Sequence, residues 1–156
     1  MKEYILNLLE KNDETCVAVA LFLTDKNTSA VQRGYFHTLF MKATQGTHSL
    51  EDLRSAFTKQ YGDPETYAVY SYERQYDKRC KPFTLGRNTS IGFLAYSSLT
   101  AGLCFYQNTT TLLAVSLAMA GVSAACLLWS RFRYGESVER LHSEINVYLN
   151  VLKGVK

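Results

Sequence analysis

One long uncharged stretch limits what this chain can fold into more than any other feature. Between Arg87 and Arg131 lie 43 residues without Asp, Glu, Lys, Arg or His, whereas charged residues are frequent on both sides. A membrane-spanning helix needs about 20 predominantly apolar residues, so the stretch has room for two. Because backbone groups in lipid must be satisfied within helices, we expect two antiparallel membrane helices, at residues 89–106 and 111–129, joined by a polar link.

The rest of the sequence predicts an all-α protein around this hairpin. Tyr4, Ile5 and Leu8 recur at the three- and four-residue intervals of an amphipathic helix. The tripeptide at residues 63–65, Asp-Pro-Glu, is a strong helix start. We expect four segments: a soluble helical lobe at residues 1–63, a basic juxtamembrane helix at 64–87, the transmembrane hairpin at 88–130 and a cytoplasmic amphipathic helix at 131–156.

Three details of these segments can be predicted more closely. The apolar run from Cys16 to Leu23 is too short to cross a bilayer and is expected to be a buried helix or strand of the lobe. Pro82 is expected to interrupt the juxtamembrane helix, because proline lacks the N–H that a helix interior needs. The lobe helix that follows this apolar run is expected to face the core through Val31, Tyr35 and Leu39, with Phe36 and Phe40 as further candidates.

Basic residues predict the orientation of the hairpin. Several lie within about fifteen residues of its two ends and none lies in its link. Cytoplasmic flanks carry such an excess of Lys and Arg, so both termini are expected in the cytoplasm. Near an anionic surface each basic residue contributes ~1 kcal/mol of attraction. We therefore expect lipid-facing basic side chains at Arg74, Lys78, Arg79, Lys81, Arg87, Arg131 and Arg133.

Small residues in the two spans have two interpretations. They form small-x-x-x-small patterns, which bring helix backbones close together in lipid. They either close the hairpin on itself or join one copy to another as a homo-oligomer. A polar lining from Ser97, Thr100, Ser116, Ser123 and the link at residues 107–111 is a third interpretation, less favoured than ordinary helix packing. The positions concerned are Gly92, Ser98, Gly102, Ala114, Ala118, Gly121 and Ala125.

The last segment carries a narrow apolar stripe. Its members recur at three- and four-residue intervals, a pattern suited to packing against one partner helix. We expect this stripe to bind a cytoplasmic protein through Val138, Leu141, Ile145, Leu149 and Leu152.

No pattern in the sequence predicts an enzyme. His37, His48 and His142 fall in separate predicted helices without metal-ligand spacing, and no glycine-rich loop follows a strand. The net charge of +3 is too small to indicate nucleic-acid binding. We therefore expect no catalytic residue, no metal and no cofactor, and the expected partner is membrane lipid.

Two stretches of sequence resemble a known family. They are residues 72–79 (YERQYDKR) before the hairpin, and RFRYGE at 131–136 leading to ERLHSEINVY at 139–148 after it. They resemble the bacterial two-transmembrane effector domains called SLATT domains, which accompany nucleotide-sensing modules in defence systems. The resemblance leaves residues 1–63 unexplained. It implies a non-enzymatic effector that oligomerises and permeabilises the bacterial inner membrane.

A second family has a similar layout. It comprises secreted bacterial effectors and inclusion-membrane proteins, in which a hairpin anchors the chain in a host membrane with both tails in the host cytosol. On this alternative the protein is a hairpin-anchored interaction or adaptor protein. The sequence alone does not separate the two.

Overall fold

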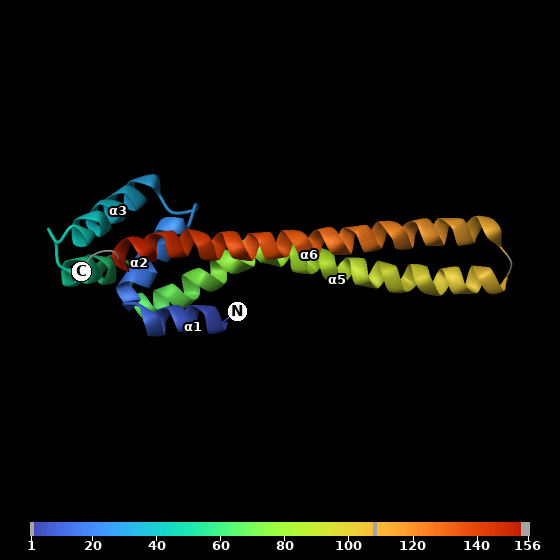
Figure 1. Cartoon of the computed structure of the whole chain (residues 1–156), viewed down its shortest axis with the longest axis horizontal. Helices are drawn as coiled ribbons and strands as arrows, with labels where there is room; N and C mark the ends of the chain where they lie inside the picture. The colour runs from blue at the N-terminus through green and yellow to red at the C-terminus, as the bar shows by residue number, and fades with distance from the viewer. Residues whose placement is uncertain (1, 108, 154–156) are drawn as a thin grey trace. The chain divides into compact units, whose positions relative to one another are not determined.

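The computed structural model describes residues 2–107 and 109–153, and every regular element among them is an α-helix. The predicted all-α class is confirmed for this part of the chain. Figure 1 shows the order of the helices along the chain. They are α1 (Lys2–Lys11), α2 (Glu14–Thr24), α3 (Ala30–Thr44), α4 (Leu50–Tyr61), α5 (Pro64–Tyr106) and α6 (Thr110–Lys153).

The chain forms two compact units. The first, which we call the lobe, contains Met1–Asp77 and Arg140–Lys156, and the second, the hairpin unit, contains Lys78–Glu139. The long helices α5 and α6 each contribute to both units. This division differs from the four predicted segments, because residues 64–77 and 140–153 belong to the lobe and not to separate helices beside it.

Helix α2 lies at the centre of the lobe. Every residue from Thr15 to Thr24 is buried, and the helix contacts α1, α3 and α4. A helix that is apolar all round is stable in water only when neighbours cover all its faces. The apolar run at residues 16–23 is therefore a core helix, as predicted.

Local sequence sets the ends of the lobe helices. Asp13 accepts hydrogen bonds from the N–H groups of Thr15 and Cys16 at 2.8 and 3.3 Å and so caps α2. Ser49 and Asp52 form a reciprocal capping box at the start of α4. Gly62 ends α4 with a φ of +83°, a conformation that glycine adopts without steric cost. These caps fix where the chain turns between packed helices.

The C-terminal apolar stripe is covered by the chain itself. Leu141 and Ile145 are 0% exposed and Leu149 is 3% exposed, and all three belong to the core of the lobe. Val138 is half-buried in the hairpin unit, and the side chain of Leu152 lies outside the described ones. A buried side chain cannot contact another protein unless the lobe opens. The expectation that this stripe binds a separate protein is therefore corrected: its partner helices are in the same chain.

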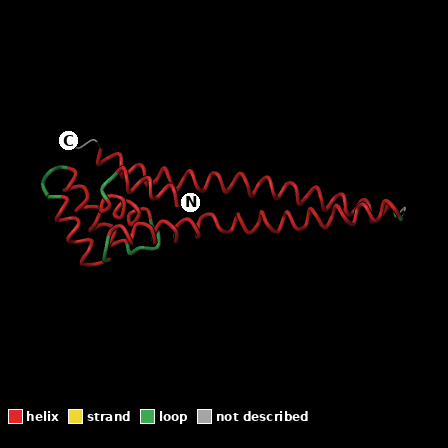
Figure 2. The backbone as a smooth tube through the Cα atoms, turned by 90° about the horizontal axis from the view of Figure 1, so that it is seen from below, coloured by secondary structure: helices red, strands yellow, loops and turns green. Residues whose placement is uncertain are grey.

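The hairpin unit consists of two antiparallel helical segments, residues 78–106 of α5 and 110–139 of α6. They lie side by side in both views, and a short link joins their ends (Figures 1 and 2). The link between Tyr106 and Thr110 falls where the sequence predicted it. Helix α5 continues through Pro82, which corrects the expected interruption: a proline removes one backbone hydrogen bond and leaves those of the turns on either side.

Only α6 is long and apolar enough to cross a membrane among the described helices. Just 6% of its most apolar window is buried, unlike a soluble core helix such as α2. The corresponding part of α5 does not reach the same apolarity, so the prediction of two membrane-spanning helices is supported for one of them.

Removing the ring of Phe22 should destabilise the lobe strongly. Phe22 is fully buried, and its ring centroid lies 5.2 Å from that of Phe36 and 4.9 Å from that of Tyr61. Because the large cavity left behind cannot be refilled, Phe22→Ala should lower the free energy of unfolding by about 3–5 kcal/mol. Urea unfolding in detergent micelles, followed by circular dichroism, measures this. Val31→Ala, at a site 82% exposed, is the control and should change little.

Candidate functional site

Small polar side chains line the contact between α5 and α6 in the hairpin unit. Ser90 and Ser97 of α5 are 9% and 1% exposed, and Ser116 and Ser130 of α6 are 9% and 6% exposed. Ser123 is half-buried. The serines on each helix are seven residues apart, the interval at which helices of a coiled coil present the same face. We call these five residues the serine seam.

The two helices approach closely along this seam. A Cβ atom added to Gly86 of α5 would lie 3.4 Å from the Oγ of Ser130 on α6. Nearby, the rings of Phe83 and Trp129 meet edge to face, with their centroids 6.4 Å apart. Small residues at the seam allow this approach, as they do between helices in lipid.

Large apolar side chains point away from the seam. Phe105 is 76% exposed and Leu99 70% exposed. A groove of about 480 Å³ on the flank of the hairpin is also lined mainly by apolar groups, among them Phe93, Met119 and Val122. The remaining outward residues, all at least 50% exposed, are Leu85, Ile91, Tyr96, Leu103, Tyr106, Leu112, Val115, Leu117, Leu128, Trp129 and Phe132.

The seven small residues predicted for helix packing also lie on the outside. All of them are exposed, and a Cβ added to Gly92, Gly102 or Gly121 would meet nothing within 4 Å. At about 100° per residue, the α6 positions 114, 118, 121 and 125 lie roughly 150° around the helix from the seam. These residues do not close the hairpin. The seam uses other residues, and contact of these small residues with a second copy stays a prediction.

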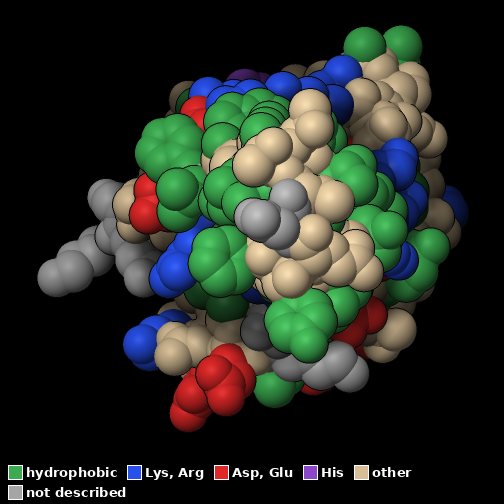
Figure 3. All heavy atoms as spheres, turned by 90° about the vertical axis from the view of Figure 1, so that its right-hand side faces the viewer, with side chains coloured by type: hydrophobic (Ala, Val, Ile, Leu, Met, Phe, Trp, Pro, Cys, Tyr) green, Lys and Arg blue, Asp and Glu red, His purple; other side chains and the backbone are tan. Residues whose placement is uncertain are grey.

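Basic side chains collect at one end of the hairpin unit. Lys78, Lys81, Arg87, Arg131 and Arg133 are exposed and Arg79 is half-buried, and none lies between residues 88 and 130. Figure 3 looks at the link end, where the atoms in front are hydrophobic or uncharged. The unit holds six of the 17 basic and two of the 14 acidic residues, a net charge of +4, whereas the rest of the chain carries −1.

An aromatic residue accompanies this basic end. The guanidinium of Arg133 lies 5.9 Å from the ring centroid of Trp129 and donates a 2.7 Å hydrogen bond to Glu136. Trp129 itself is 61% exposed. Tryptophan beside arginine is typical of the boundary between lipid tails and headgroups.

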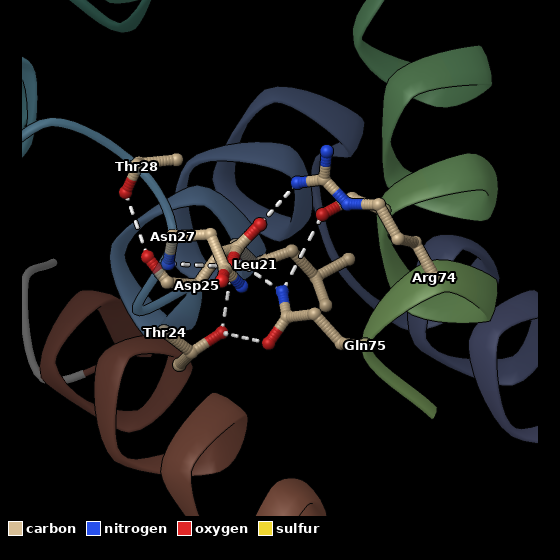
Figure 4. Close-up of polar contacts among 8 residues, drawn as sticks. Leu21, Thr24, Asp25, Asn27, Thr28, Arg74 and Gln75 are labelled. Atoms are coloured by element: carbon tan, nitrogen blue, oxygen red, sulfur yellow. Dashed lines mark hydrogen bonds and ion pairs between the residues drawn. The ribbon is translucent and has the colours of Figure 1, made fainter. Parts of the chain in front are cut away.

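Arg74 lies in the lobe and is not lipid-facing, which corrects the prediction. It forms an ion pair with Asp25, whose side chain is only 1% exposed (Figure 4). A carboxylate so deeply buried is stable in its charged form only with a partner of opposite charge. The sequence signal for this pair was the single acid that directly follows the apolar run of α2, and sequence reasoning missed it.

Gln75 extends this polar network. Its side-chain amide donates a 2.7 Å hydrogen bond to the carbonyl of Leu21, and Thr24 donates to the Gln75 carbonyl oxygen at 3.3 Å (Figure 4). The backbone N–H and side chain of Asn27 donate to Asp25 at 2.9 and 2.7 Å. The end of α2 is therefore tied to α5 by hydrogen bonds as well as by charge.

A second cluster in the lobe joins α1 to the two long helices. The Tyr4 ring of α1 stacks on His142 of α6 with 3.5 Å between centroids. The Tyr72 hydroxyl of α5 lies 2.9 Å from Nε2 of the same histidine. Burial lowers the pKa of His142, so the ring is neutral at pH 7. Tyr72 and His142 thus connect α5 and α6 directly.

The described residues contain no group of three His, Cys, Asp or Glu side chains placed to hold a metal ion. His37 is exposed on α3, and His48 is exposed in the loop that follows it. Burial and the neighbouring Asp13 carboxylate raise the pKa of the Cys16 thiol to about 12, so this cysteine is unreactive at neutral pH. The arrangement offers a surface for lipid and for helix packing. Comparison with protein families, characterised proteins and solved structures found no match.

Asp25→Asn should weaken the lobe in a pH-dependent way. Burial raises the pKa of Asp25, but the hydrogen bonds from Asn27 and the charge of Arg74 outweigh it, so the folded-state pKa lies below the usual value of 3.8. The stabilisation is therefore present above about pH 4 and is lost as the pH falls through the folded-state pKa. At pH 7 the variant should lose about 1–3 kcal/mol.

The measurement compares urea unfolding of the variant and the wild type from pH 7 to pH 2. Their difference should shrink as the pH falls below 4. Asp63→Asn is the matched control, because Asp63 caps α5 from an exposed site and asparagine caps equally well. An equal loss of stability in both variants at every pH would contradict the role of the ion pair.

Proposed function

We propose that this chain is a membrane protein whose α5 and α6 enter the bilayer together, and that it self-associates and makes that membrane permeable under control of the lobe. The observation that carries the proposal is the polarity of the hairpin unit. Its large apolar side chains face outward while small polar ones face inward. Water favours the opposite arrangement, since exposed apolar area raises the free energy in water by about 25 cal/mol per Å².

The weaker apolarity of α5 fits a paired insertion. Its hydroxyl groups bond to the carbonyls of their own helix: exposed Ser98 donates to Leu94 at 2.8 Å, and half-buried Thr100 donates to Tyr96 and Ser97 at 3.0 Å each. Hydroxyls satisfied in this way are tolerated in lipid. The more apolar α6 would carry α5 into the membrane.

The course of the chain supports a hairpin with both ends on one side. The chain leaves the lobe at Asp77 and returns to it at Arg140. A folded lobe that contains both flanks occupies one side of a membrane, so the segment between them crosses twice or not at all. Basic residues at the lobe-proximal end and none at the link favour the cytoplasm for the lobe.

Self-association is supported by the small residues on the outside. Exposed Gly102 and Gly121 are not used by the hairpin's own packing, since a Cβ atom added to either would meet nothing within 4 Å. In lipid, where apolar surface alone gives no attraction between helices, such positions permit close backbone contact with a second copy. Permeabilisation is the effect that the resemblance to SLATT domains implies.

Control by the lobe is supported by the helices that form its core. The lobe contains the ends of both long helices, with Tyr72 of α5 and Leu141 of α6 in one core. A signal that loosens this core would change how the two helices are held. The bacterial inner membrane is the proposed location. The alternative is a hairpin-anchored adaptor in a host membrane. Finding that the protein is monomeric and causes no leakage would favour this alternative.

The proposed topology can be measured in bacterial cells. A cysteine-free variant with Gln107→Cys at the link should react with an impermeant maleimide added outside intact spheroplasts. Tags at the two ends should resist external protease until the membrane is broken. Ends that are cut on opposite sides, or a link thiol that reacts only after lysis, would rule out the two-span arrangement.

Gly121→Leu should disrupt self-association and reduce leakage. A leucine on the exposed small face keeps the backbones of two copies apart, so association should weaken by about tenfold or more. Insertion should be unchanged because leucine is more apolar than glycine. Leakage of a small dye during expression and oxidative crosslinking through the exposed thiol of Cys126, in a Cys104→Ser background, measure both effects.

Val122→Leu is the control, because Val122 is already large and lies next to Gly121 on the helix surface. It should leave crosslinking and leakage as in the wild type. Crosslinked dimers that persist at wild-type levels in Gly121→Leu would contradict self-association through this face.

A further inference from the structure

Hydroxyl groups on the two sides of α5 are satisfied differently. On the outward side, Ser98 donates to Leu94 at 2.8 Å, and Thr89 donates to the carbonyls of Leu85 and Gly86, at 3.0 Å each. Ser97 is the neighbour of Ser98 but lies in the seam. Within the described part of the chain, no group pairs with the buried Oγ of Ser97.

This unpaired hydroxyl is deeply enclosed. Ser97 is 1% exposed, and its Oγ makes no hydrogen bond to the carbonyl one turn earlier. A buried polar atom without a partner is rare in folded proteins, and most such atoms contact water. The position therefore indicates a polar ligand small enough to enter the seam.

The rest of the seam offers further hydroxyl groups as partners. Ser116, Ser123 and Ser130 place a hydroxyl at every second turn of α6, and Ser90 continues the row on α5. A bound water molecule needs two to four polar contacts. Serines on two facing helices can supply them, and two of these serines, Ser90 and Ser123, also line the otherwise apolar groove beside Phe93 and Met119.

We propose that the serine seam is the hydrated path through the membrane, lined by Ser97, Ser116 and Ser123. The inference rests on the proposed function, in which α5 and α6 span the bilayer. The seam is closed in this structure, because four of its five serines are at most 9% exposed. It becomes a path when the two helices separate, and the large apolar side chains then stay in lipid.

The residues that line the path also determine which solutes can pass through it. No acidic or basic residue lies between residues 88 and 130, so the path has no charged ring to select cations or anions. Water and small ions of either sign should pass with little discrimination. The hydroxyl groups can replace part of the hydration of an ion but cannot compensate its charge.

Two adjacent serines provide the test. In a cysteine-free background, Ser97→Cys and Ser98→Cys place nearly isosteric thiols on the seam and on the lipid-facing side of the same turn. A charged methanethiosulfonate reagent reacts with thiolates, which form only in contact with water. During expression that causes leakage, the thiol of Ser97→Cys should react at least about tenfold faster than that of Ser98→Cys, and its modification should reduce the leak.

A second pair on α6 guards against a local defect at one site. Ser123→Cys on the seam should behave as Ser97→Cys does, and Leu128→Cys, at a position 66% exposed and outside the groove, should behave as Ser98→Cys does. Circular dichroism and equal membrane levels establish that all four variants fold and insert.

The outcomes separate this inference from the proposed function. Fast reaction of the two seam thiols, in Ser97→Cys and Ser123→Cys, without any leakage would keep the hydrated seam and overturn permeabilisation. Leakage with equal rates for the seam and outer thiols, or with faster reaction of the outer ones, would keep permeabilisation and overturn the seam as its path. No reaction of the Ser97→Cys thiol, with or without leakage, overturns the inference as well.

Discussion

The structure depends on one reversal of polarity, which separates the hairpin unit from the lobe. In the lobe, Phe22, Phe36 and Phe57 are buried together in an aromatic cluster, as the hydrophobic effect requires in water. In the hairpin unit the serines are inside, and residues such as Leu99 and Phe105 are outside. A single solvent does not favour both arrangements.

The hairpin unit is joined to the lobe by the two long helices themselves. Helices α5 and α6 are continuous through both units, and their lobe portions supply Tyr72, Leu141 and Ile145 to its core. The ion pair of Asp25 with Arg74 links the end of α2 to α5, and the contact of Tyr72 with His142 links α5 to α6. The fold of the lobe is therefore completed by the first turns of α5 and the last turns of α6.

Much of this organisation could be predicted because it rests on local chemistry. The uncharged stretch, the link near residue 107 and the start of α5 at Pro64 follow from charge, polarity and capping. The buried face of α3 was harder to predict: Val31 and Tyr35, which were expected in the core, are 82% and 52% exposed. Phe36 and Phe40 occupy the core, because the arrangement of neighbouring helices decides which of two adjacent apolar faces is buried.

The candidate site could also be predicted only in part, because it too depends on how distant segments are arranged. The sequence indicated which residues were small but not which face of α6 they occupied relative to α5, since that depends on the register between two distant segments. The seven-residue spacing of Ser116, Ser123 and Ser130 was a readable signal for the seam. Arg74 was assigned to lipid because its buried partner, Asp25, is 49 residues away in the sequence.

The two units also differ in how strongly they hold α5 and α6 together. In the lobe each buried Leu or Ile contributes about 1.5–3 kcal/mol, and Leu141, Ile145 and Leu149 all lie in the core. Along the seam the contacts are between serines and other small groups, and a hydrogen bond between helices in lipid contributes only about 0.6 kcal/mol on average. The pairing of the two helices is therefore determined mainly in the lobe.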